Sequence, residues 1–222
     1  AADVAALCLD GATHTAVLLD ENDRVIRPAI YWTDKRAGEE AAFLKEKYGE
    51  MIVERAFNSP SALWTLPQLM WLQAHEPENH ARIRRVLSMK DYVRYRLTGD
   101  FVTDSIEAMG FMLLDARTNE WDAELLNLCG LTKDVMPRIV DPQCVLGAMS
   151  AQALADTGLS PETKVIAGST DTVMEVYASG AIHPGQATLK LATAGRICPI
   201  TDHAILSPLL VTYRHVVSGL WY

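Results

Sequence analysis

A carboxylate stands where an apolar stretch gives way to a helix-forming one. Residues 165–168 (VIAG) have the apolar or small side chains of a buried strand, and residues 173–179 have the composition of a helix that ends at Gly180. Asp171 lies between them. Ligand sites of open α/β folds lie at the carboxyl ends of such strands, so Asp171 is a candidate ligand-site residue. It can equally be a helix N-cap that accepts backbone N–H groups, and the spacing leaves both interpretations open.

A second candidate site is the sequence YWTDKR, residues 31–36. An indole such as that of Trp32 can stack on the apolar face of a carbon chain, while Asp34 and Arg36 can bind hydroxyl groups at fixed angles. This combination is typical of a polyol or sugar site. The alternative is a structural corner between a strand and a helix, in which Asp34 caps a helix beginning at Arg36 and the Arg36 side chain is solvated.

Alternating strand-like and helix-like segments must hold these residues in place. Strands are expected over residues 4–9, over 15–20 and 24–32 as a hairpin, over 165–168, over 186–200 with a turn near Ala194, and over 208–217. Helices are expected over residues 36–48, 65–77, 78–87, 90–98, 121–129, 150–158 and 173–179, several of them ended by a glycine such as Gly49 or Gly99. The sequence therefore predicts a mixed α/β chain, with strands at both ends and a helical insert over about residues 36–160.

The composition of the chain limits its partners and its location. A formal net charge of −8 and a single short basic run (RIRR, residues 82–85) argue against nucleic acid as the main partner. No apolar run has membrane-spanning length and no signal peptide opens the chain, so we expect a cytoplasmic protein that does not bind membranes. Cys8, Cys129, Cys144 and Cys198 are widely spaced, which predicts reduced core residues rather than a disulfide framework or a zinc site.

Four groups of residues follow one another along the chain as the motifs of one protein family. Residues 27–36 (RPAIYWTDKR) contain a W-x-D-x-R segment, residues 137–147 a P…G segment, and residues 167–195 a G-x-x-D-x…G…PG segment that ends in ATAG. A K-D-Y…LTG…TD…A…LD…W run is matched by Lys90, Asp91, Tyr92, Leu97, Thr98, Gly99, Thr103, Asp104, Ala108, Leu114, Asp115 and Trp121. Together these motifs cover essentially the whole chain, and the chain resembles the FGGY carbohydrate kinases, the family of the xylulose, ribulose, glycerol and gluconate kinases.

The resemblance implies an actin-like (ribonuclease H-like) α/β fold with a helical insert. It implies that residues 1–191 form the sugar-binding N-terminal domain, incomplete at its start, and that residues 192–222 begin a truncated C-terminal nucleotide-binding domain. The phosphate loop that opens the family's fold is then expected upstream of residue 1, and most of the nucleotide domain beyond Tyr222.

The resemblance also assigns roles to the candidate residues. In such kinases the aspartate after this strand is the general base in the cleft between the domains, which maps onto Asp171, and a substrate-contacting polar residue maps onto Thr172. Trp32, Asp34 and Arg36 belong to the sugar side. Phosphoryl transfer needs a positioned nucleophile, a proton acceptor and neutralisation of charge, and a rigidly held carboxylate supplies the acceptor.

Two segments depart from the family pattern. Residues 9–20 (LDGATHTAVLLD) superficially resemble the opening phosphate loop, but they fit better the later strand where pentulose kinases carry a Met-His pair that contacts the sugar. His14 matches that histidine, with a solvated turn histidine as the alternative, and Thr13 replaces the methionine. In ATAG, Thr193 and Gly195 retain the phosphate-side turn that would bind ATP, whereas Ala192 replaces a glycine; a plain β-turn is the alternative.

These observations predict the ATP-dependent phosphorylation of a primary hydroxyl group on a pentulose or related polyol, as in the xylulose kinases of the family. Mg²⁺ is expected to arrive with ATP rather than in a dedicated protein site. The expected partner is a small sugar, and both a homodimer and a monomer are open. The sequence also leaves open a kinase for glycerol, erythritol, gluconate, ribulose or a signalling sugar, a catalytically silent sugar-binding fragment without an ATP site, and an actin-type or chaperone-type ATPase of the same fold.

Overall fold

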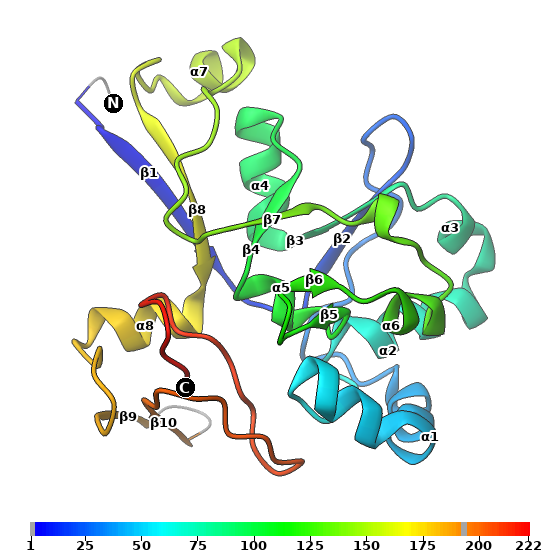
Figure 1. Ribbon diagram of the computed structural model, residues 1–222. Coiled ribbons are helices and arrows are strands. Elements are labelled where there is room, and N and C mark those ends of the chain that lie inside the picture. The colour runs from blue at the N-terminus through cyan, green and yellow to red at the C-terminus, as the bar shows by residue number, and fades with distance from the viewer. Residues whose placement is uncertain (1–2, 192–194) are drawn as a thin grey trace.

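Paired strands form the framework of the structure, and helices pack around them (Figure 1). The computed structural model describes residues 3–191 and 195–222. Three strand pairs make the framework: β1 (Ala6–Gly11) runs parallel to β8 (Lys164–Thr170), β2 (Ala16–Leu19) antiparallel to β3 (Arg85–Ser88), and β4 (Val102–Asp104) parallel to β7 (Arg138–Val140). Strand β8 also packs beside β4, so three segments that are far apart in the sequence meet here.

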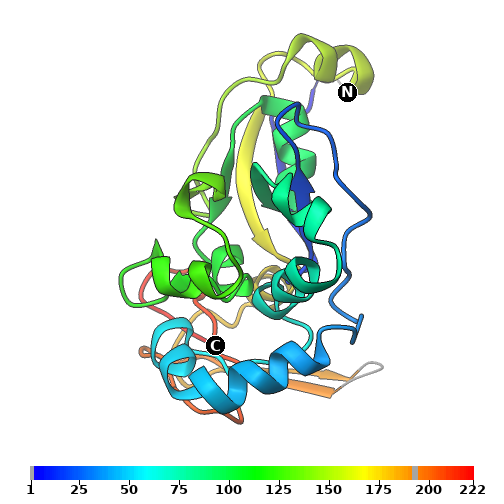
Figure 2. The same ribbon diagram turned by 90° about the vertical axis from the view of Figure 1, so that its right-hand side faces the viewer.

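The helices lie mostly between β2 and β8 in sequence. They are α1 (Gly38–Ala56), α2 (Thr65–His75), α3 (Pro77–Ala81), α4 (Met89–Thr98), α5 (Glu107–Gly110), α6 (Ala123–Leu128), α7 (Ala151–Thr157) and α8 (Asp171–Ala178), with a 3₁₀ turn at Lys133–Val135 and a short antiparallel pair β5 (Leu114–Asp115) and β6 (Glu120–Trp121). The largest cluster of buried apolar side chains joins α1, α2 and α6. Figure 2 shows α1 at the opposite end of the molecule from the N-terminus.

The junction of β8 and α8 depends on a glycine. Gly168 has a φ of +73°, and a Cβ atom there would lie 1.9 Å from the carbonyl oxygen of Leu9 on β1. This close approach coincides with a shift in strand register between Cys8 and Asp10. Only glycine fits such a contact with a neighbouring backbone, and it keeps the ends of β1 and β8 side by side.

Several expected elements differ in their bounds or pairing. The hairpin expected over residues 15–20 and 24–32 is wrong, because β2 pairs with β3 and only an isolated bridge, Leu19 to Val25, remains of it. Pro28 has no N–H group to donate to a second strand. The helix expected to stop at Gly49 continues to Ala56, because buried side chains such as Ile52 beyond the glycine anchor it to the core.

The region expected to be a helical insert also contains the short strands β3 to β7. Helix α3 ends at Ala81, and Val86 and Leu87, expected in a helix, are fully buried in β3. The strand expected over residues 208–217 is wrong, since the chain is irregular there apart from a bridge between Arg214 and Trp221. The expected hairpin near residue 194 is present as β9 (Ala187–Leu191) and β10 (Gly195–Pro199), and Thr193 lies outside the described residues.

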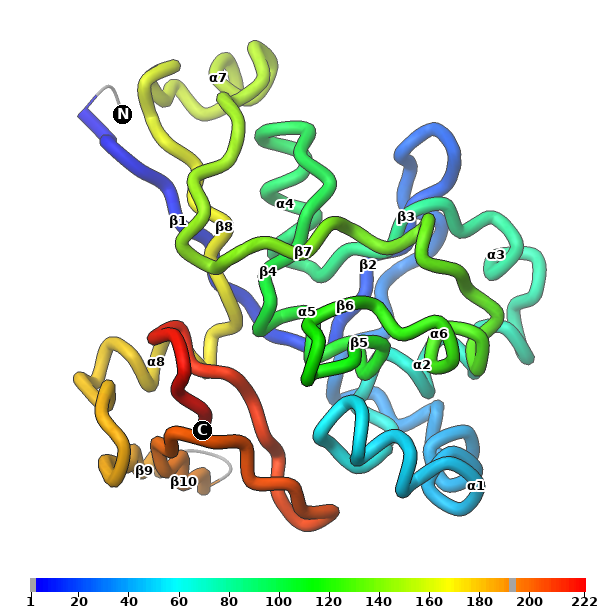
Figure 3. Tube along the Cα trace, in the orientation of Figure 1, coloured from blue at the N-terminus to red at the C-terminus, as the bar shows by residue number. Residues whose placement is uncertain are grey.

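The last segment of the chain folds back beside α8 (Figure 3). Backbone N–H groups of Tyr213 and Tyr222 each donate to the carbonyl of the other residue at 2.9 Å. Asn58, which is fully buried, donates to the Thr212 carbonyl and accepts from the Thr212 N–H group, both at 2.9 Å. These two hydrogen bonds hold the last segment against the end of α1.

Within residues 3–191 and 195–222, no helix combines the length and the apolar character that a membrane crossing requires. The four cysteines are free thiols in the structure. Cys8, however, is exposed on β1 instead of lying in the core, because the side chains of β1 are covered only in part.

Candidate active site

Asp171 lies at the position expected from the sequence, as the first residue of α8 directly after β8. Its carboxylate is exposed, so this position carries no cost of burying a charge. The Oδ1 atom accepts from the Thr172 N–H group at 2.6 Å and from the Thr172 hydroxyl at 3.3 Å. The helix cap is Thr170, whose hydroxyl accepts from the Val173 N–H group at 3.4 Å. Among the described residues no hydrogen bond reaches Oδ2, so one oxygen is free to accept a proton.

A hollow of about 450 Å³ opens beside Asp171. It is lined by Thr13 and His14 after β1, by Thr170 and Thr172 at the start of α8, by Gly195 and Arg196 of β10, and by residues of the last segment that include Thr212, Tyr213, Trp221 and Tyr222. The Asp171 charge contributes to the raised pKa of both Tyr213 and Tyr222, whose largest cause is burial, so the carboxylate lies near them. The hollow has the size of a small-ligand site. Four of the residues predicted from the sequence line it together: Thr13, His14, Thr172 and Gly195.

His14 is held in place by contacts on three sides. Its Nδ1 atom lies 3.1 Å from the Gly110 carbonyl oxygen, and its Nε2 atom lies 3.3 Å from the Tyr213 hydroxyl. The ring meets the Trp64 ring edge-on at a centroid distance of 4.4 Å. Burial lowers the pKa of His14 to about 4, so the imidazole is neutral at neutral pH. The alternative of a solvated turn histidine does not fit these contacts.

Thr13 lies directly against Gly110 at the end of α5. A Cβ atom on Gly110 would come within 2.0 Å of the Thr13 hydroxyl oxygen and within 3.4 Å of the Tyr213 hydroxyl oxygen. Any side chain at position 110 would therefore displace Thr13. The absence of a side chain at Gly110 allows Thr13, His14 and Tyr213 to gather at one wall of the hollow.

Arg196 and Tyr213 are site residues that the sequence interpretation missed. Arg196 donates to the Thr172 hydroxyl at 2.7 Å and to the Glu175 carboxylate at 2.7 Å. Arg196 supplies a positive charge next to Gly195. Because it directly follows the ATAG segment, the sequence could have marked it as a site residue. No local pattern marks Tyr213, because its contact with His14 joins residues far apart in the sequence.

A cluster of buried charges supports the strand ends behind the hollow. The Lys90 ammonium lies 2.6 Å from the Asp91 carboxylate and 2.8 Å from that of Asp104, and Arg94 lies 2.7 Å from Asp91. Asp104 also accepts from the Ser169 hydroxyl at 2.9 Å. Burial disfavours the Lys90 ammonium, but Asp104 and Asp91 outweigh it and hold the pKa of Lys90 above its ordinary value. This network fixes β4 and α4 to β8, two residues before Asp171.

Glu107 lies at the edge of this cluster and is also buried. Burial raises the pKa of its carboxyl group well above the ordinary value, and the charges of Asp91 and Asp104 add to this effect. Its Oε2 atom has no hydrogen-bond partner among the described residues. Burial therefore favours the protonated, neutral form of Glu107 over the charged form.

Comparison with known proteins decides the family. The domain described as "FGGY family of carbohydrate kinases, N-terminal domain" matches residues 1–177. The chain belongs to the FGGY family of carbohydrate kinases. Its fold is accordingly the actin-like (ribonuclease H-like) α/β fold of the sugar kinases, as the sequence predicted.

Named FGGY relatives cover nearly the whole chain. It is 33% identical to a xylulose kinase of Escherichia coli (strain K12) over 99% of the chain and 46% of the relative, and 32% identical to one of Bacillus subtilis (strain 168) over 89% and 40%. The crystal structure of a xylulose kinase from Rhodospirillum rubrum superposes with a TM-score of 0.93 at 32% identity, over 98% of this chain and 45% of that one. The chain thus spans about half the length of these relatives.

The W-x-D-x-R segment of this FGGY chain is not among the residues that line the hollow. Asp34 and Arg36 pair with each other, with Nη2 and Oδ2 2.8 Å apart, and the hydrogen bond from Arg36 is the main cause of the lowered pKa of Asp34. The Arg36 guanidinium also lies 4.8 Å from the centre of the Trp71 ring, and Trp32 is 41% exposed. Asp34 does not cap α1, which begins at Gly38 without a side-chain cap.

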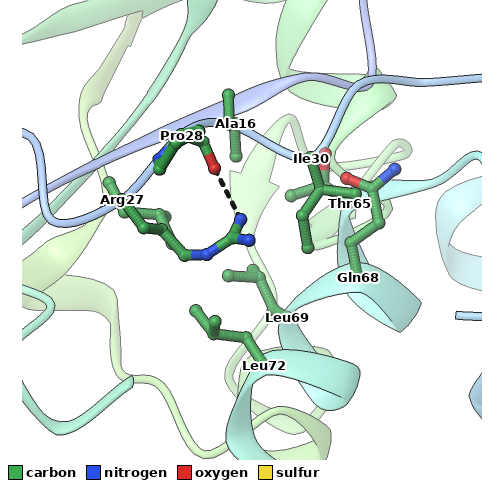
Figure 4. A pocket seen from close by; sticks show the side chains of 10 residues that line it. Ala16, Arg27, Pro28, Ile30, Thr65, Gln68, Leu69 and Leu72 are labelled. Atoms are coloured by element: carbon green, nitrogen blue, oxygen red, sulfur yellow. Dashed lines mark hydrogen bonds between the residues drawn. The ribbon is translucent and has the colours of Figure 1, made fainter. Parts of the chain in front are cut away.

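The loop that leads into this segment packs on α2 (Figure 4). Arg27 donates to the Pro28 carbonyl at 2.6 Å, and Ile30 lies beside Leu69 and Leu72 of α2 around a hollow of about 20 Å³. That volume holds about one water molecule, which is too little for a sugar. The arrangement is that of a packed corner between a loop and a helix.

No cluster of three metal-binding side chains occurs among the described residues. On the β10 side of the hollow, Arg196 carries a positive charge that pairs with Glu175, and a Cβ atom on the neighbouring Gly195 would meet open space.

Proposed function

We propose that this chain forms the sugar side of a carbohydrate kinase that transfers the γ-phosphoryl group of ATP to a primary hydroxyl of a pentulose, with D-xylulose as the first candidate. The observation that carries the proposal is the free Oδ2 atom of Asp171 beside a hollow that also holds His14 and Thr172. Relatives named xylulose kinase support the choice of sugar. Because the chain spans about half their length, the activity of the whole enzyme is part of the proposal.

In the proposed reaction, the sugar hydroxyl oxygen forms a bond to the γ-phosphorus of ATP while the bond from that phosphorus to the bridging oxygen of ADP breaks. Asp171 accepts the hydroxyl proton, Thr13 and Thr172 bind the sugar, and His14 belongs to the same wall of the sugar site. Arg196, next to Gly195, stabilises the negative charge on the oxygens of the transferred phosphoryl group. Mg²⁺ bound to ATP would neutralise the phosphate oxygens.

The proposal includes further residues and the organisation of the whole protein. Thr193 would face the phosphates but lies outside the described residues. Trp32, Asp34 and Arg36 are proposed for the sugar side, although they do not line the hollow. The division into a sugar-binding domain at 1–191 and the start of a nucleotide-binding domain at 192–222, the cytoplasmic location and the homodimer are likewise proposals.

The test is ADP release with D-xylulose, D-ribulose, glycerol, erythritol and gluconate as acceptors. In the whole kinase that contains this chain we expect turnover with D-xylulose, and a loss of at least about a hundredfold in kcat in Asp171→Asn, because the amide cannot accept the proton. The 222-residue chain alone is expected to be inactive, because it spans about half the length of its relatives. The matched control is Asp156→Asn, an exposed carboxylate on α7 that accepts a hydrogen bond from Gln152. It should leave kcat unchanged.

Two outcomes would redirect the proposal. Turnover with another acceptor only would reassign the substrate. Sugar binding without turnover would instead favour a catalytically silent sugar-binding chain, and Asp171→Asn would then leave the sugar affinity nearly unchanged.

A further inference from the structure

Tyr213 joins the last segment of the chain to the residues that follow β1. Its hydroxyl lies 3.3 Å from His14 Nε2, and its ring stacks between the rings of Trp64, at a centroid distance of 6.1 Å, and Tyr222, at 6.0 Å. It is 5% exposed and lines the hollow beside Asp171. The roles proposed above for this hollow do not use Tyr213.

The direction of each hydrogen bond follows from the partners. The Gly110 carbonyl can only accept, so His14 Nδ1 must carry the proton in the 3.1 Å contact. A neutral imidazole has one N–H group, which leaves Nε2 as an unprotonated acceptor. The Tyr213 hydroxyl must then donate to Nε2. Both ring nitrogens of His14 are thus occupied within the protein.

We propose that Tyr213 is a positioning and substrate-selecting residue, which holds His14 in its Nδ1–H tautomer and offers the lone pairs of its own hydroxyl oxygen to the sugar. This inference rests on the proposed function. Since the single proton of the Tyr213 hydroxyl is engaged with His14, this point of the hollow can only accept a hydrogen bond. His14 then supports the sugar contact through Tyr213.

An acceptor at this point distinguishes between classes of ligand. The hydroxyl group of a neutral sugar can donate to the Tyr213 oxygen, whereas a carboxylate such as that of gluconate has only acceptor atoms and is disfavoured. The Asp171 carboxylate nearby adds to this preference, because it repels a second negative charge. The wall formed by Thr13, His14 and Tyr213 therefore selects a hydroxyl-bearing, uncharged acceptor.

The first experiment reads the state of His14 without any substrate. Long-range ¹H–¹⁵N spectra of the ¹⁵N-histidine-labelled chain at pH 7 should show His14, assigned by its absence in His14→Gln, with a protonated Nδ1 and an unprotonated, hydrogen-bonded Nε2. Tyr213→Phe should shift the Nε2 resonance toward that of an unprotonated imidazole nitrogen that accepts no hydrogen bond. Tyr222→Phe is the matched control, since it makes the same change in the same aromatic stack and should leave the His14 resonances in place.

The second experiment measures ligand selection by calorimetric titration. In Tyr213→Phe we expect the Kd for D-xylulose to rise about fivefold to tenfold, the effect of one lost hydrogen bond. The preference for D-xylulose over gluconate should fall by a similar factor, and urea unfolding should show that the variant is folded. An unchanged preference would overturn the selecting role, and a protonated Nε2 in the unaltered chain would overturn the positioning role.

Failure of the proposed function gives a different result. If the unaltered chain binds none of the tested sugars, the kinase proposal loses its support while the His14 spectra still decide whether Tyr213 sets the tautomer. If the chain binds D-xylulose but Tyr213→Phe changes neither the spectra nor the Kd, the kinase proposal stands and the role of Tyr213 is rejected.

Discussion

His14 makes its contacts as a neutral ring, and this couples the site to pH. Burial lowers its pKa to about 4, while an unfolded histidine titrates near 6.5. As the pH falls through this window, the unfolded chain takes up a proton that the folded chain does not bind. The stability contributed by this residue is therefore complete above pH 6.5 and is lost progressively down to pH 4.

For the unaltered chain we predict that His14 lowers the free energy of unfolding by about 2 kcal/mol between pH 7 and pH 5. In His14→Gln, which cannot titrate, this part of the pH dependence should be missing. Urea unfolding of both proteins at pH 5, 6 and 7 measures the difference. Comparing how the free energy of unfolding changes with pH in each protein removes any pH-independent effect of the substitution on stability. Equal slopes would mean that His14 titrates normally in the folded chain.

The sequence predicted the residues whose contacts are local and missed those whose contacts are distant. Asp171 and Thr172 follow from the junction of one strand with one helix, and His14 from a family motif. Tyr213 contacts His14 only because the last segment packs on α1 and α8. No sequence pattern near Tyr213 predicts that contact. Asp34 and Arg36 had both a functional and a structural interpretation. Their ion pair matches neither the expected helix cap nor the expected solvated arginine, and their role on the sugar side stays a prediction.

At the scale of elements, buried charges decide how β4, α4 and β8 are joined. The Asp104 carboxylate accepts from the Ile106 and Glu107 N–H groups and from Ser169, and it pairs with Lys90. In the same surroundings, burial favours the neutral form of Glu107. The Asp104 carboxylate thus has hydrogen-bond and ion-pair partners, whereas Glu107 Oε2 has no hydrogen-bond partner among the described residues.

We predict opposite outcomes for the two corresponding amides. Asp104→Asn should lower the free energy of unfolding by about 3 kcal/mol, because it removes one of the two carboxylates that pair with the buried Lys90 ammonium. Glu107→Gln should leave stability at pH 7 unchanged or raise it, since the folded chain binds a proton there that an unfolded glutamate releases above its pKa of 4.5. Urea unfolding at pH 7 compares both with the unaltered chain. A loss in Glu107→Gln as large as that in Asp104→Asn would show that Glu107 is ionised.

The helix bounds show what a glycine signal can and cannot predict. Gly99 and Gly158 end α4 and α7 in the left-handed conformation, with φ of +77° and +66°. Gly49 does not end α1, because residues on both sides of it bury apolar side chains in the core. That helix ends instead at Phe57, with a φ of +63°. Sequence alone did not reveal which glycines the core would hold within a helix.

For the molecule as a whole, the hollow exists because the last segment returns to α1. Asn58 fixes this return by two hydrogen bonds to the backbone of Thr212. We predict that Asn58→Ala lowers the free energy of unfolding by about 2 kcal/mol, since it leaves two buried backbone groups unpaired. Amide hydrogen exchange at Thr212 and Tyr213 should become faster than exchange in β8, and the affinity for D-xylulose should fall.

The matched variant is Asn58→Asp, which keeps the size and the acceptor but cannot donate to the Thr212 carbonyl. It should destabilise the chain at least as much at pH 7, because it also places an unpaired charge at a fully buried position. Unchanged exchange at Thr212 in both variants would mean that the aromatic stack alone holds the segment.

The contact between His14 and Tyr213 also has a consequence for the order of events during synthesis. The two residues are 199 positions apart, so at ~5–20 residues per second a ribosome adds Tyr213 about 10–40 s after His14. Until Tyr213 is added, His14 and Trp64 lack their contacts with its ring. A sugar can draw its full stabilising contact with the nascent chain only after Tyr213 has been added. Until then the growing chain must avoid aggregation through its own contacts or with the help of chaperones.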